Sequence, residues 1–264
     1  VSNCMYGEII FMERQSKNEK LLQYFKDICL IPRQTGDEEA ISEYLLDFAK
    51  ARGLQAERDA NDNVLIRKPS TIPGYKGPTV IVQGHMDIVY EKSADSTHKY
   101  EDGIHVVEED GYLKSADGTS LGADNGLAVA YAMDLLDRND LPLPALEILI
   151  TSSEEVGLEG VKHLELTDVK GSYLINLDAE EEGVFFTSCA GGVRTDLSLP
   201  LKYTGSTEDI TYTLTLCGLN GGHSGLDIAL GKANAIQLVG RILYHIAPFA
   251  RISSLDAPGK ANAI

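Results

Sequence analysis

Four segments of the chain carry the side-chain types that bind divalent metals. They read GHMD at 84–87, GADNG at 122–126, SSEEVG at 152–157 and NLD at 176–178. Each segment holds a carboxylate, and the first also holds a histidine. Imidazole nitrogens with carboxylate oxygens are the donor set that zinc and similar divalent metals accept. Taken together, the four segments therefore predict a metal site.

Taken singly, most of these segments also have a structural interpretation. His85 alone reads first as a hydrogen-bonded loop histidine. Asp124 stands at the start of a helical pattern, where a carboxylate can simply cap backbone N–H groups. Glu154 and Glu155 are harder to explain in this way, because two adjacent carboxylates repel each other near a buried strand end unless a cation is present.

Two further carboxylates complete the candidate set. Asp87 follows His85 by two residues, and a ligating histidine usually donates its other ring N–H to such a carboxylate, which fixes the tautomer. Asp178 follows an apolar run directly, whereas the glutamates after it read as solvated loop. We therefore expect Asp87 to orient His85 and Asp178 to stand at a strand end.

The elements that must position these residues alternate along the chain. Apolar periodicity predicts helices over 19–30, from an N-cap at Asp37 to Gly53, over 126–136 and over 161–166. Short apolar runs predict strands at 63–68, 79–83, 146–151 and 173–177, and 91–120 reads as a polar connection. This alternation predicts an α/β domain with a largely parallel, mixed sheet flanked by helices and a functional face at the strand ends.

The pattern changes after Gly183. Residues 193–202 and 210–216 alternate like half-exposed strands, and 230–246 has helical periodicity. We interpret 1–12 as an extension, 13–187 as the N-terminal part of a catalytic domain, and 188–264 as part of a second domain.

Composition excludes several classes of function. The net charge of −17, without a basic stripe, opposes binding to nucleic acid. No apolar run is long enough to span a membrane, and the start of the chain lacks a secretory signal, so we expect the cytoplasm. The four cysteines form no CxxC pair, which argues against a thiolate zinc site. A phosphate-loop motif is also absent from the sequence.

The ordered set HMD, GADNG, SSEEVG and NLD resembles the co-catalytic zinc peptidases of the aminoacylase and carboxypeptidase clan, most closely the aminoacyl-histidine dipeptidases. The resemblance covers roughly residues 13–264. It implies a zinc-peptidase-like catalytic domain followed by the start of an α+β lid domain. It also implies hydrolysis of Xaa-His and other unblocked dipeptides with two Zn²⁺ ions, for which Mn²⁺ or Co²⁺ can substitute.

The resemblance also implies a role for each candidate residue. His85 and Asp178 would ligate one metal, Glu155 the other, and Asp124 would bridge them. Glu154 would remain unligated as the general base, taking a proton from the metal-activated water.

In the lid domain the segment GLNGGHSG matches a substrate-binding motif of the family. The resemblance implies that His223 holds the substrate carbonyl oxygen or carboxylate, with Asn220 and Ser224 as weaker candidates. The lid would also be the contact surface of a homodimer. The family closes its second metal site with a further histidine that matches no histidine here, so we expect a truncated chain that binds metal but has impaired turnover.

Two other functions remain open at this point. An N-acyl amino-acid deacylase would share the same metal core, and substrate assays distinguish it from a dipeptidase. The second of these alternatives is a non-catalytic metal-binding module. The Glu154–Glu155 pair argues against that module, because only catalysis needs an unligated Glu154.

Overall fold

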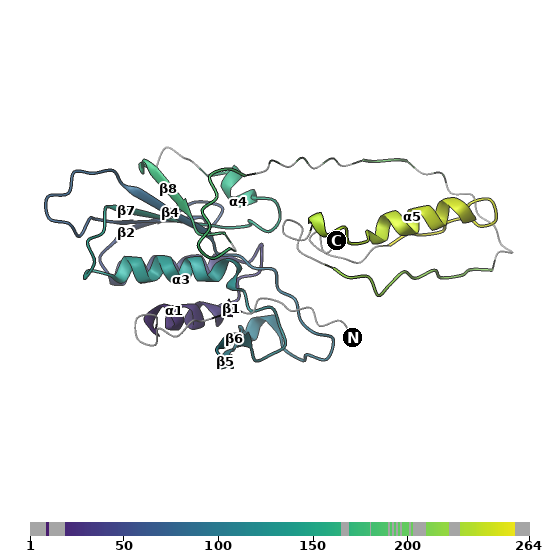
Figure 1. Ribbon diagram of the computed structural model, residues 1–264, viewed down its shortest axis with the longest axis horizontal. Helices are drawn as coiled ribbons and strands as arrows, with labels where there is room; N and C mark the ends of the chain where they lie inside the picture. The colour runs from purple at the N-terminus through teal and green to yellow at the C-terminus, as the bar shows by residue number, and fades with distance from the viewer. Residues whose placement is uncertain are drawn as a thin grey trace. The chain divides into compact units, whose positions relative to one another are not determined.

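The computed structural model describes residues 9–10, 19–164, 169–179, 181–189, 191, 193, 195, 197–200, 202, 210–221 and 228–256. The chain divides into two compact units. The first unit is Cys4–Thr187, and the second is Ser188–Ile264 together with Val1–Asn3. Figure 1 shows the helices and strands of each.

A five-stranded sheet in the order β2-β3-β7-β4-β8 forms the centre of the first unit (Figure 1). Its strands are β2 (Gln55–Arg58), β3 (Val64–Lys68), β4 (Val80–His85), β7 (Leu146–Thr151) and β8 (Tyr173–Asn176). β4 is parallel to β7 and β8, whereas β3 is antiparallel to both β7 and β2. All strands except β3 therefore run in the same direction, which confirms the predicted largely parallel, mixed sheet.

Three helices cover the sheet and bury one face each. They are α1 (Glu19–Cys29), α2 (Glu39–Ala51) and α3 (Ala123–Asp137). Figure 1 shows α3 along one face of the sheet with α1 beside it. Phe25 and Ile28 of α1 and Ile41 of α2 are completely buried. Each such side chain contributes about 1.5–3 kcal/mol to stability.

The start of α2 differs from the prediction. Its N-cap is Glu38, and no side chain caps the helix. Asp37 instead accepts a hydrogen bond from the Tyr100 hydroxyl at 3.0 Å. Glu38 is buried and accepts from both the backbone N–H and the hydroxyl of Ser153, each at 3.0 Å. A tertiary partner, Tyr100, has therefore taken the Asp37 carboxylate that the local sequence assigned to capping.

A hairpin lies in the segment 91–120, which the sequence pattern predicted to be a plain connection. It consists of β5 (Val106–Glu109) and β6 (Tyr112–Ser115), follows the short helix η1 (Tyr100–Asp102), and pairs with β1 (Ile9–Ile10). Asp110 and Gly111 form its turn with φ values of 54° and 81°. An Asp-Gly pair with both φ angles positive is the signature of a two-residue hairpin turn. This dipeptide was the signal that could have revealed the hairpin.

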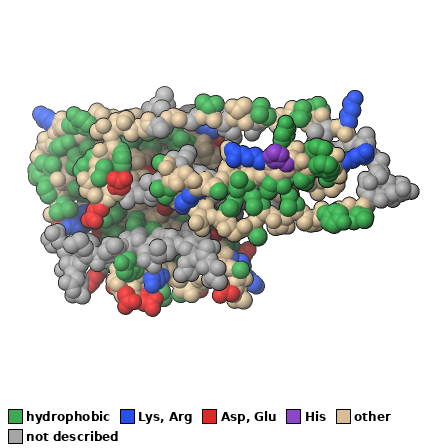
Figure 2. Space-filling model, turned by 45° about the vertical axis from the view of Figure 1, so that its right-hand side comes forward, with side chains coloured by type: hydrophobic (Ala, Val, Ile, Leu, Met, Phe, Trp, Pro, Cys, Tyr) green, Lys and Arg blue, Asp and Glu red, His purple; other side chains and the backbone are tan. Residues whose placement is uncertain are grey.

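The second unit contains the helix α5 (Ala235–Ile246) and the short helix η3 (Ile228–Leu230). The Asn234 side chain caps α5 by accepting from the Gln237 N–H at 3.0 Å. None of the residues of α5 is buried, and Figure 2 shows exposed hydrophobic side chains along this unit.

The strands predicted at 193–202 and 210–216 do not form in those residues of the two ranges that the structure describes. An alternating pattern indicates two faces of a strand but supplies no partner for its backbone hydrogen bonds. Within the described parts of the chain, no helix is long and apolar enough to cross a membrane.

Candidate metal centre

The four predicted segments meet at one edge of the sheet. His85 is the last residue of β4, the Glu154–Glu155 pair follows β7, and Asp178 follows β8. Because β4, β7 and β8 are parallel neighbours, their carboxyl ends lie together. Asp124 reaches the same edge from the start of α3. The topology therefore brings together side chains that are far apart in the sequence; His85 and Asp178, for example, are separated by more than 90 residues.

His85 lies at the centre of this group and is almost completely buried. Its Nε2 atom lies 3.1 Å from Oδ1 of Asp124, 3.7 Å from Oδ1 of Asp178 and 3.9 Å from Oε2 of Glu154. Its Nδ1 atom lies 3.0 Å from the carbonyl oxygen of Asp87. One ring nitrogen thus faces three carboxylates, and the other is held by the backbone.

Asp87 is completely buried and connects two strand ends. Its carboxylate accepts the backbone N–H groups of Glu154 and Glu155, at 3.1 and 3.2 Å, and the Thr35 hydroxyl at 2.9 Å. Burial alone would raise the pKa of Asp87, but the hydrogen bonds from His85 and from these donors hold it below its usual range. Asp87 therefore stays ionised and fixes the loop that carries the glutamates.

Asn125 joins α3 to two of the strand ends, and sequence reasoning gave it no role. Its Oδ1 accepts the backbone N–H of His85 at 3.2 Å, and its Nδ2 donates to Oδ1 of Asp178 at 2.8 Å. Gly84 makes room for this amide, because a Cβ there would collide with the Asn125 oxygen. The sequence signal for this contact is the glycine in GHMD.

Arg33 holds two of the ligand-bearing segments together, a role that the sequence did not indicate. Its side chain is 1% exposed, and its two terminal nitrogens donate to the carbonyl oxygens of Met86 and Gly122, each at 2.8 Å. Met86 belongs to the GHMD segment and Gly122 to the GADNG segment. One buried guanidinium therefore links two of the four segments. No spacing in the sequence marks this arginine.

The charges of the group favour a bound cation. Burial and the neighbouring charge of Asp124 raise the pKa of Glu155 to about 7, against the opposing effect of His85. Burial likewise raises the pKa of Asp178 to about 6. Burial lowers the pKa of His85, but hydrogen bonds to Asp124 and Asp87 outweigh it and raise the value to about 10. Glu155 and Asp178 thus take up protons as the pH falls below neutral, and a bound metal ion would compete with those protons.

The donor atoms are close enough to share an ion. One atom each from His85, Asp124 and Glu155 lies within 4.8 Å of the other two. This set of one imidazole nitrogen and two carboxylate oxygens fits zinc and similar divalent metals. Asp178 lies beside this group, with 3.7 Å between its Oδ1 and Nε2 of His85.

The predicted substrate-binding residues belong to the second unit. His223 and Ser224 lie outside the described residues. Asn220 is described and exposed to solvent. Their predicted roles therefore stay predictions.

Comparison with known proteins identifies relatives. No protein-family model matches the chain. The cytosol non-specific dipeptidase of Escherichia coli is 38% identical over 87% of this chain and 47% of its own length.

Solved structures give a consistent result. The aminoacylhistidine dipeptidase of Vibrio alginolyticus has a TM-score of 0.63 and 32% identity, over 87% of this chain and 47% of its own. A tripeptidase from Staphylococcus aureus has a TM-score of 0.52 and 25% identity, over 61% of this chain and 43% of its own. This chain is therefore related to the cytosol non-specific and aminoacylhistidine dipeptidases, and it spans about half the length of these relatives.

Proposed function

We propose that this chain carries the catalytic centre of a metal-dependent dipeptidase that acts on Xaa-His and other unblocked dipeptides. One observation carries the proposal. Nε2 of buried His85 faces the carboxylates of Asp124 and Asp178, at 3.1 and 3.7 Å, beside the paired glutamates that follow β7. The relationship to dipeptidases supports the choice of substrate, and the name of the E. coli relative supports a cytosolic location.

The proposed metals are two zinc ions, with manganese or cobalt as substitutes. His85 and Asp178 would hold one ion, Glu155 would hold the other, and Asp124 would be a ligand to both. This assignment is supported by the donor chemistry and by the raised pKa values of Glu155 and Asp178, because a nearby cation favours the ionised form of a carboxylate and would lower both values. When bound, such a pair of ions lowers the pKa of a shared water and polarises the scissile carbonyl.

Glu154 is the proposed general base. Its Oε2 lies 3.9 Å from Nε2 of His85, at the edge of the donor group, and its side chain is partly exposed. Its backbone N–H is held by Asp87 at 3.1 Å, which limits the positions that its carboxylate can take. A carboxylate held beside the ligands can take a proton from water and deliver it to the leaving amine.

The second unit supplies the proposed substrate contacts. His223 would hold the substrate carbonyl oxygen or carboxylate, with Asn220 and Ser224 nearby in the sequence. The exposure of Asn220 is compatible with contact to a ligand. We also propose that this unit provides the contact surface of a homodimer, which size-exclusion chromatography with light scattering can test.

Substitution of Glu154 by Gln tests the proposed chemistry. The variant should keep its metal content and lose at least about a hundredfold in dipeptide turnover, because loss of a general base typically has an effect of this size. Exposed Glu181 provides the matched control, since Glu181→Gln should change neither property. The assay uses the complete gene product as well as the 264-residue chain. Preserved turnover in Glu154→Gln would contradict the assignment, and activity on N-acylated amino acids alone would indicate a deacylase.

A further inference from the structure

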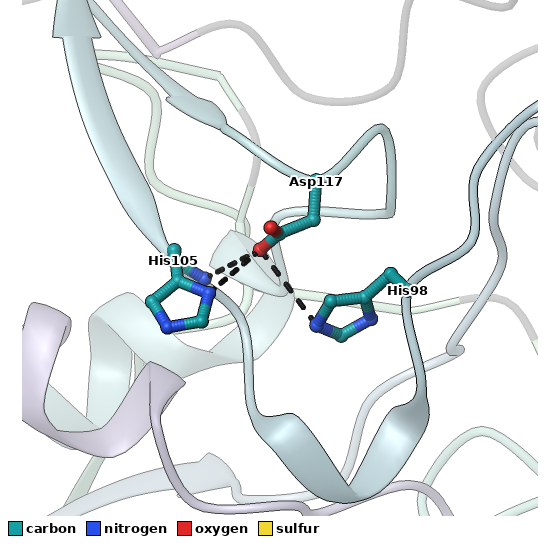
Figure 3. Close-up of side chains that lie close together, drawn as sticks. All are labelled: His98, His105 and Asp117. Carbon is teal, nitrogen blue, oxygen red and sulfur yellow. Dashed lines mark hydrogen bonds and ion pairs between the residues drawn. The ribbon is translucent and has the colours of Figure 1, made fainter.

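The group at the strand ends consists of His85, Asp124, Glu154, Glu155 and Asp178 and is named the strand-end centre. A second group of side chains that could bind a metal lies in the first unit and shares no residue with that centre. It consists of His98, His105 and Asp117 (Figure 3). One nitrogen from each histidine and one oxygen of Asp117 lie within 4.8 Å of one another. Oδ2 of Asp117 lies 3.1 Å from Nδ1 of His105 and 3.7 Å from Nε2 of His98. Figure 3 shows Asp117 between the two rings.

The backbone of the β5–β6 hairpin brings two of the three candidate metal ligands together. His105 immediately precedes β5, and Asp117 is the second residue after β6. The Ala116 N–H donates to the His105 carbonyl at 2.8 Å, which extends the hairpin to its open end. The His105 N–H also donates to Oδ2 of Asp117 at 3.0 Å. The hairpin therefore holds Asp117 beside the backbone of His105 before any ion binds, which reduces the entropic cost of binding.

His98 comes from the loop before η1, and hydrogen bonds hold both of its ring nitrogens. Nε2 lies 2.6 Å from the Gly103 carbonyl oxygen, and Nδ1 lies 2.8 Å from the Tyr90 hydroxyl. With Nε2–H bonded to Gly103, the Tyr90 hydroxyl donates to Nδ1. If Nε2 binds a metal, Nδ1 carries the proton and donates to the same hydroxyl, which can accept as well as donate. Ligating histidines usually have such an oxygen partner on their other nitrogen.

Asp117 is suited to be the charged ligand. Burial alone raises its pKa, but hydrogen bonds from the backbone and ring of His105, together with nearby His98, hold the pKa below its usual range. The carboxylate is therefore ionised at neutral pH. His105 is half exposed, so its ring can turn to complete the site without disturbing the core.

We propose that His98, His105 and Asp117 bind a borderline divalent metal ion, and that Zn²⁺ is the ion that fits best. Two imidazole nitrogens and one carboxylate oxygen form a common set of three protein ligands, and water can take the fourth position. Ligand atoms about 2.0–2.1 Å from a tetrahedral ion lie roughly 3.3 Å apart. The distances of 3.1 and 3.7 Å from Asp117 are close to this spacing.

The ion has a structural consequence in this position. It cross-links the loop before η1 to the open end of the hairpin, within the connection between β4 and α3. Because an ion that binds only the folded state stabilises it by mass action, Zn²⁺ raises the melting temperature through this site. The alternative is a hydrogen-bonded cluster that holds the hairpin without metal, and the experiment below distinguishes the two.

The test removes two ligands of the strand-end centre and measures how much Zn²⁺ the chain still binds. In a tag-free Asp124→Ala/Glu155→Ala chain, calorimetric titration with Zn²⁺ should show one bound ion. Adding His105→Gln should weaken that binding by at least about tenfold, since one of three protein ligands is lost. Exposed His163 provides the matched control, and His163→Gln should leave the affinity unchanged.

Two results would overturn the proposal. One is a natively folded double variant, checked by circular dichroism, that binds no Zn²⁺. The other is a His105→Gln variant whose affinity equals that of its parent. If the double variant does not fold, metal analysis compares the unaltered chain with its His105→Gln variant. The proposal then requires the loss of one Zn²⁺ per chain, and equal metal content contradicts it.

Discussion

The carboxylate of Asp87 accepts the backbone N–H of Glu154 at 3.1 Å, and this bond ties the loop after β7 to the loop after β4. The neighbouring N–H of Glu155 reaches the same carboxylate at 3.2 Å. Asp87 also contacts the His85 ring, with 3.3 Å between its Oδ1 and Nδ1. One buried carboxylate thus sets the positions of a proposed base and two proposed ligands relative to each other.

Replacement of Asp87 by Asn should weaken metal binding at the strand-end centre by about 10–100-fold, the usual effect of losing a partner behind a ligating histidine. The amide would place an N–H group against the backbone N–H of Glu154 or Glu155, and it would remove the charge that holds His85. Zn²⁺ titration calorimetry measures the effect. Exposed Asp95 is the control, and Asp95→Asn should behave like the parent chain. Equal affinities for both variants would contradict the role of Asp87.

Gly84→Ala should destabilise the chain by about 1–3 kcal/mol, the usual cost of overpacking a buried site. The added methyl would collide with the Asn125 oxygen and lie 2.6 Å from Cβ of Ala128. Displacement of Asn125 should weaken metal binding as well. Urea denaturation measures the free energy of unfolding. In the control, Gly240→Ala, the new methyl meets nothing within 4 Å, so no loss of stability is expected. A Gly84→Ala chain as stable as its parent would show that the contact is not tight.

Arg33→Met should cost about 2–4 kcal/mol, because it leaves the buried carbonyl groups of Met86 and Gly122 without their donor. Since these carbonyls belong to two ligand-bearing segments, metal affinity should fall too. Denaturant unfolding and Zn²⁺ titration test both effects. Partly exposed Arg138 offers the control, and Arg138→Met should change stability by less than about 1 kcal/mol, the usual contribution of surface ion pairs. A stable Arg33→Met chain with normal metal affinity would refute this role.

Metal binding at the strand-end centre should weaken as the pH falls. The pKa of Glu155 is raised to about 7 and that of Asp178 to about 6, so the metal-free protein takes up protons on both groups below neutral pH. Those protons compete with the ion, and affinity should fall more than about tenfold between pH 7.5 and 5.5. The Zn²⁺-induced rise in melting temperature of the His105→Gln chain, measured at both values, reports this change. A rise that is equal or larger at pH 5.5 would contradict the expected proton competition.

Much of the first unit could be predicted from the sequence, because its strands and helices have strong periodicity. The strand predicted at 146–151 is β7, and its six residues are all buried. The parallel arrangement of β4, β7 and β8 followed from the alternation of strands and helices. That arrangement brings His85, Asp124 and Asp178 to one edge, as the motifs suggested.

The remaining features depend on contacts between distant residues, which periodicity does not report. Asn125 and Arg33 act through hydrogen bonds to segments up to 89 residues away, as between Arg33 and Gly122. The capping role predicted for Asp37 was wrong because Tyr100 engages its carboxylate. The cluster of His98, His105 and Asp117 depends on the β5–β6 hairpin, which the sequence analysis treated as a polar connection.

The central claim is that the strand-end carboxylates and His85 hold catalytic metal, and the most direct test is a metal count. Purified His105→Gln chain, which lacks the second proposed site, is loaded with Zn²⁺, dialysed, and compared with His105→Gln/Asp124→Ala by elemental analysis. We expect one or two Zn²⁺ per chain in the first and almost none in the second, because Asp124 is the proposed bridging ligand. A folded His105→Gln chain without metal, or an Asp124→Ala variant that keeps all of its zinc, would contradict the claim.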